Sequence, residues 1–273
     1  MARDHEVVAL SSAQLDITDP GQVAAAFAAH GPEVVINCAA YTKVDLCEQE
    51  QKRCQAVNAR GPAILADQCI DSGSRLIHIS TDYVFDGMRP VPKAYQEDDP
   101  TGPLSAYGRS KLAGEEAVLS RLQDALVVRT AWLYGMGGPN FLKTILRLAL
   151  EDPDRTLKIV NDQVGSLTWT ATLARQLHTL LDAELTGIVH ATAEGTCTWY
   201  TGAVEFFRLM DVAANIVPCA SSEYPTPAHR PANSILENRR LQQAGLNRMV
   251  SWQEDLRNFV RQHGRELLRE AGA

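Results

Sequence analysis

The sequence predicts an α/β fold in which a doubly wound parallel sheet is followed by a smaller C-terminal lobe. Apolar runs of strand length alternate with helix-length segments from the start of the chain, which is the pattern of consecutive βαβ units. This alternation loosens after residue 135. We therefore expect a sheet domain over residues 1–135 and a second lobe over residues 136–273, with the strand near 187–192 returning to the sheet.

The individual elements follow from apolar runs, helical periodicity and turn-forming residues. Strands are expected, in chain order, at residues 6–10, 33–40, 75–80, 125–132 and 187–192. Helices are expected at residues 20–30, 48–71 (with an interruption near Gly61), 104–122, 140–150, 173–183, 198–214 and 252–268. Asp19 can cap the first helix, because its carboxylate accepts hydrogen bonds from N-terminal amides. Residues 218–234 are rich in Pro and Ser and are expected to be irregular.

Length and composition restrict the class of protein. A chain of 273 residues can bury one large core or a main domain with a smaller lobe. The net charge of −7 disfavours a nucleic-acid surface. No apolar run approaches the roughly 18 residues of a membrane span, and no signal peptide is recognised, so we expect a cytoplasmic protein without a membrane or nucleic-acid partner. The six cysteines lack C-x-x-C spacing and the histidines are scattered, so reduced thiols and no metal site are expected.

Tyr107 and Lys111 lie one helical turn apart in the helix predicted over residues 104–122. Residues four apart share a helix face. A nearby ammonium favours the phenolate, so we expect Lys111 to lower the pKa of Tyr107 from its reference of about 10. Such a phenol can donate a proton to a carbonyl oxygen while hydride reaches the carbon. The alternative is an ordinary exposed Tyr and Lys, because this spacing is common.

Hydroxyl and carboxylate side chains end the apolar strand at residues 75–80. Ser80, Thr81 and Asp82 follow one another there. In open α/β sheets, ligands bind outside the carboxyl ends of the strands. Thr81 is therefore expected to hydrogen-bond the substrate oxygen that Tyr107 also addresses. Capping of a turn is the alternative, and the Tyr/Lys pair downstream favours the site.

The start of the chain lacks a feature that a dinucleotide-binding sheet normally has. Such a sheet opens with a strand, a Gly-rich turn and a helix whose first amides hold the pyrophosphate. Here Met1 stands just before an apolar run that looks like the second strand. The cluster at residues 135–139 has Asn140 where the third glycine belongs, and it is interpreted as a turn. We therefore expect a Rossmann-like sheet that lacks its first strand and Gly-rich loop.

Several longer stretches carry a resemblance to a known family. They include STDYVFDG at 80–87 and YGRSKLAGE at 107–115, together with residues 15–18, 35–45, 129–135, 140–141, 161–165 and 230–234. In this order they resemble the dTDP-4-dehydrorhamnose reductase family of extended short-chain dehydrogenases/reductases over nearly the whole chain. The resemblance implies reduction of the C4 ketone of dTDP-4-dehydro-L-rhamnose to dTDP-L-rhamnose by hydride from NADPH, a step in cell-surface polysaccharide biosynthesis. It also implies that residues 1–135 bind the dinucleotide and that residues 136–273 mainly bind substrate.

The same resemblance implies roles for individual residues. Tyr107 would donate a proton to the C4 oxygen, Lys111 would hold the nicotinamide ribose, and Thr81 would orient the substrate carbonyl. Cofactor contacts are implied for Asp16, Ile17, Ala39, Ala40, Thr42, Tyr107 and Lys111. Substrate contacts are implied for Thr81, Asp82, Trp132, Asn140 and Arg230. A core position is the alternative for Trp132, and a surface salt bridge is the alternative for Arg230.

Cofactor choice depends on the end of the second strand, where an acidic residue would bind the ribose 2′-hydroxyl and disfavour a 2′-phosphate. Ser11 and Ser12 stand at that place. NADPH is therefore expected, with NADH as the alternative. A Mg²⁺ ion between subunits, as in some members of the family, and the choice between monomer and homodimer are left open.

Two questions keep alternatives open. The sequence is either an N-terminally truncated form of a longer chain, which the intact downstream motifs favour, or a short form that binds dinucleotide poorly. The function is either that of the reductase or that of a non-catalytic regulatory or binding subunit, as in the similar regulatory subunit of methionine adenosyltransferase. A reductase of another dTDP-4-keto-6-deoxysugar is a close variant of the first interpretation.

Overall fold

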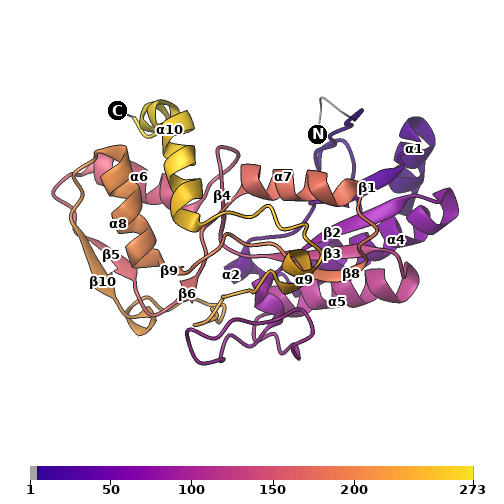
Figure 1. The fold of residues 1–273 in the computed structure, drawn as a ribbon, viewed down its shortest axis with the longest axis horizontal. Coiled ribbons are helices and arrows are strands. Elements are labelled where there is room, and N and C mark those ends of the chain that lie inside the picture. The colour runs from indigo at the N-terminus through magenta and orange to yellow at the C-terminus, as the bar shows by residue number, and fades with distance from the viewer. Residues whose placement is uncertain (1–4, 273) are drawn as a thin grey trace.

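The centre of the molecule is a parallel sheet of four strands in the order β1-β2-β3-β8 (Figure 1). The computed structural model describes residues 5–272. The strands are β1 (Val34–Asn37), β2 (Arg75–Thr81), β3 (Leu126–Thr130) and β8 (Gly187–His190). Because every pair is parallel, the carboxyl ends of all four strands meet at one edge of the sheet. The expected return of the strand near 187–192 is confirmed by its pairing with β3.

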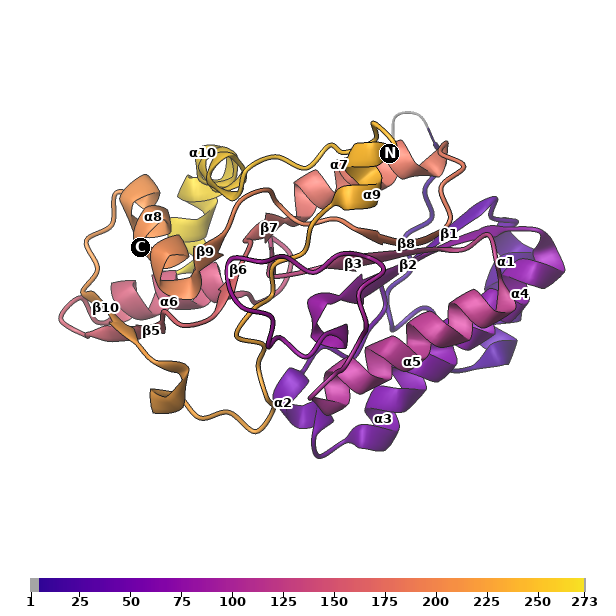
Figure 2. The same ribbon diagram turned by 60° about the horizontal axis from the view of Figure 1, so that its bottom comes forward.

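Helices cover both faces of this sheet (Figure 2). On one face lie α1 (Pro20–His30), α4 (Gly61–Ser72) and α5 (Ala106–Arg121), and on the other lie α7 (Thr170–Leu181) and α9 (Arg239–Gln243). Successive residues of a strand point to opposite faces. Accordingly, Leu76 packs in the α1 and α4 cluster, whereas Ile77 packs against the leucines of α7. Both faces of the strands are buried, which explains their continuous apolar runs.

The helix expected over residues 48–71 is divided into three parts. These are α3 (Gln51–Gln55), the π-helical turn η1 (Ala56–Arg60) and α4, with the separate short helix α2 (Val44–Cys47) before them. The side chain of Asn58 is fully buried within the π turn. Gly114 allows this turn to pack closely against α5, since a Cβ at Gly114 would lie 2.1 Å from the Asn58 carbonyl oxygen.

The second lobe packs three helices around a small sheet. The helices are α6 (Phe141–Glu151), α8 (Trp199–Met210) and α10 (Trp252–Glu270), and the sheet pairs β5 (Leu157–Val160) with β10 (Ile216–Cys219). Leu146, Phe206 and Phe259 are fully buried in its core. The remaining short elements are β4 (Leu133–Tyr134), β6 (Val164–Gly165), β7 (Thr168–Trp169), β9 (Cys197–Thr198), η2 (Asp82–Val84) and η3 (Ser221–Glu223).

Two sequence predictions about strands are wrong. Residues 6–10 form no strand, and Val7, Val8 and Leu10 are 52%, 48% and 40% exposed. Among the described residues, β1 is the edge of the sheet, and no strand pairs with its free side. Conversely, part of the segment expected to be irregular belongs to β10. Proline is unfavourable inside a sheet because it has no amide N–H to donate. An edge strand tolerates Pro218 because no amide donor is needed on its free side.

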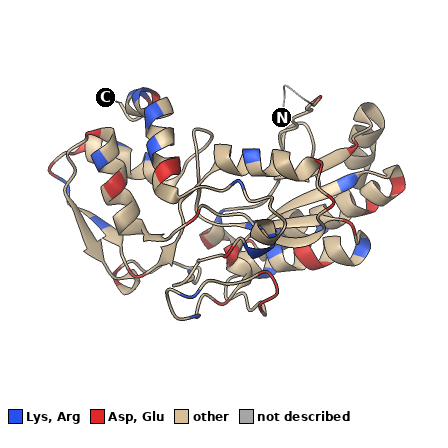
Figure 3. Ribbon diagram, viewed as in Figure 1, with Lys and Arg blue, Asp and Glu red and all other residues tan. Residues whose placement is uncertain are grey.

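Charged residues of both signs are distributed over the helices of the two lobes (Figure 3). None of the helices between residues 5 and 272 is long and apolar enough to cross a membrane. That same part of the chain brings together no group of three or more side chains that could hold a metal ion.

Candidate active site

The site forms where the carboxyl end of β2 meets the first turn of α5. Thr81 is the last residue of β2, and Tyr107 is the second residue of α5. The helix begins there because the Ser105 hydroxyl accepts a hydrogen bond from the Gly108 amide (3.1 Å). A Cβ at Gly108 would lie only 2.2 Å from the Tyr83 carbonyl oxygen. Glycine at this position therefore lets α5 begin in direct contact with the backbone that follows Thr81.

Lys111 ties α5 to the same strand from inside. Its ammonium Nζ donates a hydrogen bond to the Ile79 carbonyl oxygen (2.7 Å), and the side chain is 2% exposed. Burial lowers the pKa of Lys111 to about 8, and the nearby Glu115 carboxylate opposes this change. At neutral pH the side chain therefore remains mainly an ammonium. It is bound to the strand backbone two residues before Thr81.

Tyr107 is buried beside Thr81 and is only 9% exposed. Burial raises the pKa of Tyr107 above its usual value, while a hydrogen bond with the Thr81 side chain lowers it. The negative charge of Asp82 raises the pKa further. The expected net lowering by Lys111 is therefore wrong for this structure, because the phenol is desolvated and the ammonium is directed at the Ile79 carbonyl. Tyr107 is consequently a protonated phenol at neutral pH.

Asp82 adds a buried carboxyl group to this pair. The Thr81 hydroxyl Oγ1 donates to Asp82 Oδ1 (3.0 Å) and accepts from the Tyr83 amide (3.3 Å). Asp82 Oδ2 is buried without a hydrogen-bond partner among the described residues. Burial raises the pKa of Asp82 to about 6, against the effect of the Ser234 and Thr81 hydroxyls, which lower it.

Asn58 is a positioning residue that sequence reasoning missed. Its Oδ1 accepts from the Tyr41 amide (2.7 Å), and its Nδ2 donates to the Tyr41 carbonyl (3.1 Å) and to the Ser110 hydroxyl of α5 (3.0 Å). It thereby fixes the segment after β1 against the helix that carries Tyr107. An asparagine inside a predicted helix gives no signal of this role, because the π turn that buries it is not visible in the periodicity.

The predicted cofactor contacts fall into two groups. Ala39 and Thr42 are exposed and Ala40 is half-buried just after β1, at the same sheet edge as Thr81. In contrast, the Asp16 carboxylate accepts hydrogen bonds from the amide and hydroxyl of Thr18, and Ile17 is buried in the α1 and α4 cluster. The first group therefore leaves short side chains open at the edge of the sheet where β2 also ends. Within residues 5–272 the first regular element is α1, so no Gly-rich turn between a first strand and its helix is described.

The predicted substrate contacts lie at the junction with the second lobe. Trp132, in a left-handed conformation (φ 49°), stacks on Trp199 with ring centroids 3.7 Å apart. Arg230 pairs with Asp45 (2.9 Å) and donates to the Tyr83 hydroxyl (3.3 Å), so its guanidinium makes an ion pair in this structure.

Asn140 is already engaged within its own turn. Its Oδ1 accepts from the Lys143 amide (3.2 Å) as the N-cap of α6, and its Nδ2 donates to the Gly135 carbonyl (2.8 Å). The turn interpretation of residues 135–139 agrees with this arrangement, since a capping asparagine closes it. A substrate contact of Asn140 would use the second proton of Nδ2 or the second lone pair of Oδ1.

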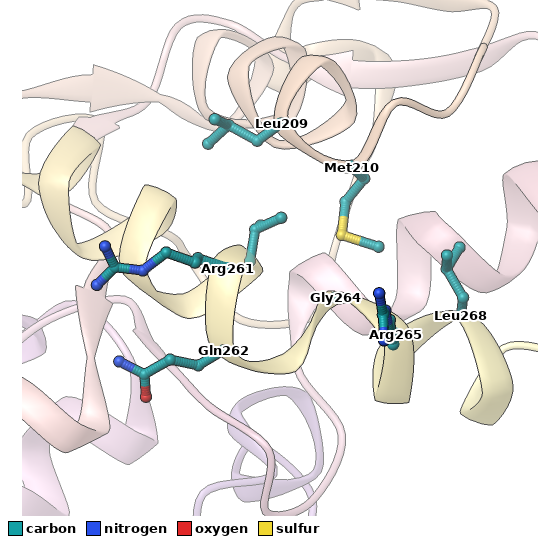
Figure 4. Close-up of a pocket in the computed structure, with 8 residues that line it drawn as sticks. Leu209, Met210, Arg261, Gln262, Gly264, Arg265 and Leu268 are labelled. Carbon is teal, nitrogen blue, oxygen red and sulfur yellow. The ribbon is translucent and has the colours of Figure 1, made fainter.

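A separate cavity of about 510 Å³ lies between α8 and α10 (Figure 4). Met210 and Leu268 line it together with Arg261 and Arg265. None of the residues predicted for catalysis, cofactor or substrate binding contributes to it. The cavity belongs to the outer packing of the second lobe and not to the site at the sheet edge.

Comparison with known proteins places this arrangement in a family. The model of the family described as RmlD substrate binding domain matches residues 1–264. A dTDP-4-dehydrorhamnose reductase of Mycolicibacterium smegmatis is 46% identical over 263 residues, which cover 95% of this chain and 79% of that protein. A probable dTDP-4,6-dihydroxy-2-methyloxan-3-one 4-ketoreductase of Streptomyces antibioticus is 42% identical, over 93% of this chain and 86% of that protein.

A solved structure shows the same fold. The crystal structure of dTDP-4-dehydrorhamnose reductase from Bacillus anthracis, in complex with NADP, superposes with a TM-score of 0.92 at 35% identity. The match covers 96% of this chain and 92% of that one. The Rossmann-like parallel sheet predicted from the sequence is thereby confirmed, and the chain belongs to the RmlD substrate binding domain family.

Proposed function

We propose that this protein reduces the C4 ketone of dTDP-4-dehydro-L-rhamnose to dTDP-L-rhamnose with hydride from NADPH. The observation that carries the proposal is the placement of Tyr107. Tyr107 is buried beside Thr81 at the carboxyl end of β2, and Lys111 of the same helix is fixed to that strand. The names of the relatives from Mycolicibacterium and Bacillus support this substrate, and the NADP complex of the latter supports the cofactor.

The side chains of this protein supply the proton and the orientation. NADPH, when bound, supplies the hydride to C4. Tyr107 is protonated at neutral pH because burial raises its pKa, so it can donate its proton to the oxygen at C4 as charge develops there. The Thr81 hydroxyl lies beside the phenol and would orient the substrate carbonyl. The site is also largely closed to water, which strengthens each of these hydrogen bonds.

The residues that would hold the two ligands lie on either side of Tyr107. Lys111 would bind the nicotinamide ribose, with Ala39, Ala40 and Thr42 along the cofactor and with Asp16 and Ile17 near the adenine. Thr81, Asp82, Trp132, Asn140 and Arg230 would contact the sugar nucleotide. NADPH in preference to NADH, a requirement for Mg²⁺, a cytoplasmic location, and the choice of monomer or homodimer remain predictions.

A second candidate substrate is another dTDP-4-keto-6-deoxysugar. The relative from Streptomyces antibioticus is named as a 4-ketoreductase of such a sugar. The proton donor would be the same, because the C4 ketone is common to both. The contacts around the rest of the ring would decide between them.

The test uses the full-length gene product with NADPH and dTDP-4-dehydro-L-rhamnose, followed by the absorbance of the reduced nicotinamide. Tyr107→Phe should lower kcat by about 10²–10⁴-fold, the usual contribution of a general acid, while the Kd for NADPH stays nearly unchanged. Tyr224→Phe, which alters a tyrosine that is 65% exposed, is the matched control and should leave both values as they are. A wild-type protein that binds NADPH but turns over no dTDP-4-ketosugar would overturn the proposal in favour of a binding or regulatory subunit.

A further inference from the structure

Trp132 stands where the chain passes from the sheet to the second lobe. β3 ends at Thr130, which is the register partner of Thr81, and β4 begins at Leu133. Between these strands Trp132 has a φ of 49°, in the left-handed region that a bulky side chain rarely adopts. Such a conformation persists only where the surrounding structure imposes it, and it is typical of functional sites. Contacts made by Trp132 must therefore fix this turn.

The second lobe supplies those contacts. The Trp199 ring, at the start of α8, stacks on the Trp132 indole with ring centroids 3.7 Å apart and ring planes inclined by 14°. The backbone of Gly165 in β6 lies against the same indole, since a Cβ there would be 2.7 Å from its Cε2 atom. The Trp132 carbonyl oxygen accepts a hydrogen bond from the Thr168 amide (3.1 Å). Side chain and backbone of Trp132 are therefore both held by the second lobe.

Trp199 is itself fixed by further contacts. Its indole Nε1 donates a hydrogen bond to Oε1 of the buried Gln163 (3.2 Å). The ring of Phe141, the first residue of α6, packs edge-on against it with centroids 4.8 Å apart. A ring that is already ordered loses little conformational freedom when another ring stacks on it. Trp199 can therefore hold Trp132 at a small entropic cost.

The N–H groups of the two indoles differ in their partners. The N–H of Trp199 is used within the protein, on Gln163. The N–H of Trp132 donates to no acceptor among residues 5–272, and it is not one of the buried polar atoms that lack a partner. It is therefore accessible to a ligand. Because an indole N–H only donates, the ligand group that it fits is an oxygen acceptor, such as a diphosphate oxygen or a sugar hydroxyl.

We propose that Trp199 is a positioning residue whose stack holds Trp132 in the left-handed turn, so that the free indole N–H faces an oxygen of the bound sugar nucleotide. The inference rests on the proposed reductase function, which supplies that ligand. Without the stack the turn at Trp132 can relax, and the fraction of the protein with its indole in place falls. The apparent affinity falls by the same factor, because only that fraction is competent to bind. The chemical step depends on Tyr107 and is unchanged.

The kinetic test removes the ring of Trp199 and then restores one. Trp199→Leu keeps an apolar side chain that cannot stack, whereas Trp199→Phe can. For Trp199→Leu, KM for dTDP-4-dehydro-L-rhamnose should rise by about 2- to 12-fold, the range set by the usual strength of an aromatic pair, while kcat stays within about twofold of the wild type. Trp199→Phe should recover most of the affinity.

The matched control is Trp252→Phe. Trp252 is a buried indole of the same lobe, 6% exposed, and its Nε1 donates to the Thr196 carbonyl oxygen (3.1 Å). This variant loses an indole from the core of the lobe without touching the stack, so it should keep the wild-type KM. A wild-type KM in Trp199→Leu, or an equal rise in Trp252→Phe, would overturn the inference.

A double-mutant cycle on binding is independent of turnover. The Kd for dTDP-L-rhamnose is measured by calorimetry without NADPH, for the wild type, Trp199→Leu, Trp132→Leu and the double variant. If Trp199 acts through Trp132, its substitution should weaken binding in the wild type and have no further effect in Trp132→Leu. Equal effects in both backgrounds would contradict the proposed role.

A spectroscopic measurement needs no variant that could fail to fold. Two stacked indoles couple their electronic transitions, so the wild type should show an exciton couplet in far-UV circular dichroism. Addition of dTDP-L-rhamnose should change this couplet, because the ligand bonds the Trp132 N–H. A couplet that is absent, or that binding leaves unaltered, counts against the inference.

Failure of this inference and failure of the proposed function give different results. If dTDP-L-rhamnose binds with the expected coupling but the protein shows no turnover, the reductase proposal fails and the role of Trp199 stands. If turnover is present but the effects of the two substitutions are additive, only the role of Trp199 fails.

Discussion

The contact between Gly108 and Tyr83 can be tested by adding a single methyl group. In Gly108→Ala the new Cβ would lie 2.2 Å from the Tyr83 carbonyl oxygen, whereas ordinary contact begins near 3.4 Å. The start of α5 must therefore move away from η2 by about 1.2 Å, the difference between these distances. A misplacement of about 1 Å in a catalytic group can cost about 10²-fold in rate, and we expect a loss of that order in kcat.

The effect on stability has two opposing parts. Overpacking of this kind costs about 1–3 kcal/mol. Alanine in place of a helical glycine returns up to about 1 kcal/mol. The net loss in the free energy of unfolding should therefore be smaller than the loss in the activation free energy of the reaction.

The measurements are kcat from nicotinamide absorbance and the free energy of unfolding from urea denaturation. Gly264→Ala is the matched control, because Gly264 also lies in a helix (α10) and a Cβ there makes only ordinary contacts at 3.5 Å and 3.7 Å. That variant should be as active as the wild type and more stable by about 0.5–1 kcal/mol. If Gly108→Ala keeps wild-type kcat, the contact with Tyr83 does not position Tyr107 and our reasoning about the helix start is refuted.

Three further predictions follow from the buried and bridging charges. Glu115→Ala should lower the free energy of unfolding by about 3–5 kcal/mol in urea denaturation, because it leaves Arg129, 2% exposed and paired at 2.7 Å, without its partner. Arg230→Lys should raise KM more than it lowers kcat in steady-state kinetics, since lysine has a single nitrogen in place of the two that reach Asp45 and the Tyr83 hydroxyl separately; an unchanged KM would exclude a role at the substrate side. Finally, the folded-state pKa of Asp82 is raised from 3.8 to about 6, so the folded protein binds more protons than the unfolded one and loses stability as pH rises through this window. Asp82→Asn should flatten urea-derived stability over this window by up to about 3 kcal/mol at 1.36 kcal/mol per pKa unit, and an equal slope in both proteins would contradict the assignment.

Some of the fold could be predicted from sequence because its signals are local. The helix over residues 20–30 is confirmed at both ends, and Asp19 caps it as expected, since a capping aspartate and a proline at the first position act within one turn. The strand before Thr81 was equally clear from its apolar run. The segment at residues 6–10 shows the limit of this reasoning, because its apolar run is exposed and pairs with no described strand, and pairing is not visible in a local pattern.

The residues that meet at the candidate site were predictable from the sequence, whereas their electrostatics were not. Tyr107, Lys111 and Thr81 could be assigned from spacing and from the resemblance, and the structure brings all three together. The direction of the Tyr107 pKa shift could not be obtained in this way. It depends on burial by Tyr83 and by the segment after β1, which are contacts between distant parts of the chain. Asn58 was missed for the same reason.

The part of the candidate site that carries Tyr107 is fixed by contacts in the protein interior. Lys111 bonds a strand carbonyl, Gly108 admits the Tyr83 backbone, and Gly114 admits the π turn that carries Asn58. Each of these contacts fixes α5 against the sheet without using a ligand. The placement of Tyr107 beside Thr81 is therefore set by packing, so substitutions at these inward-facing positions should lower kcat even though none of them touches substrate. Substitutions at exposed positions of the same sheet edge, such as Ala39 and Thr42, should instead change the affinity for ligands.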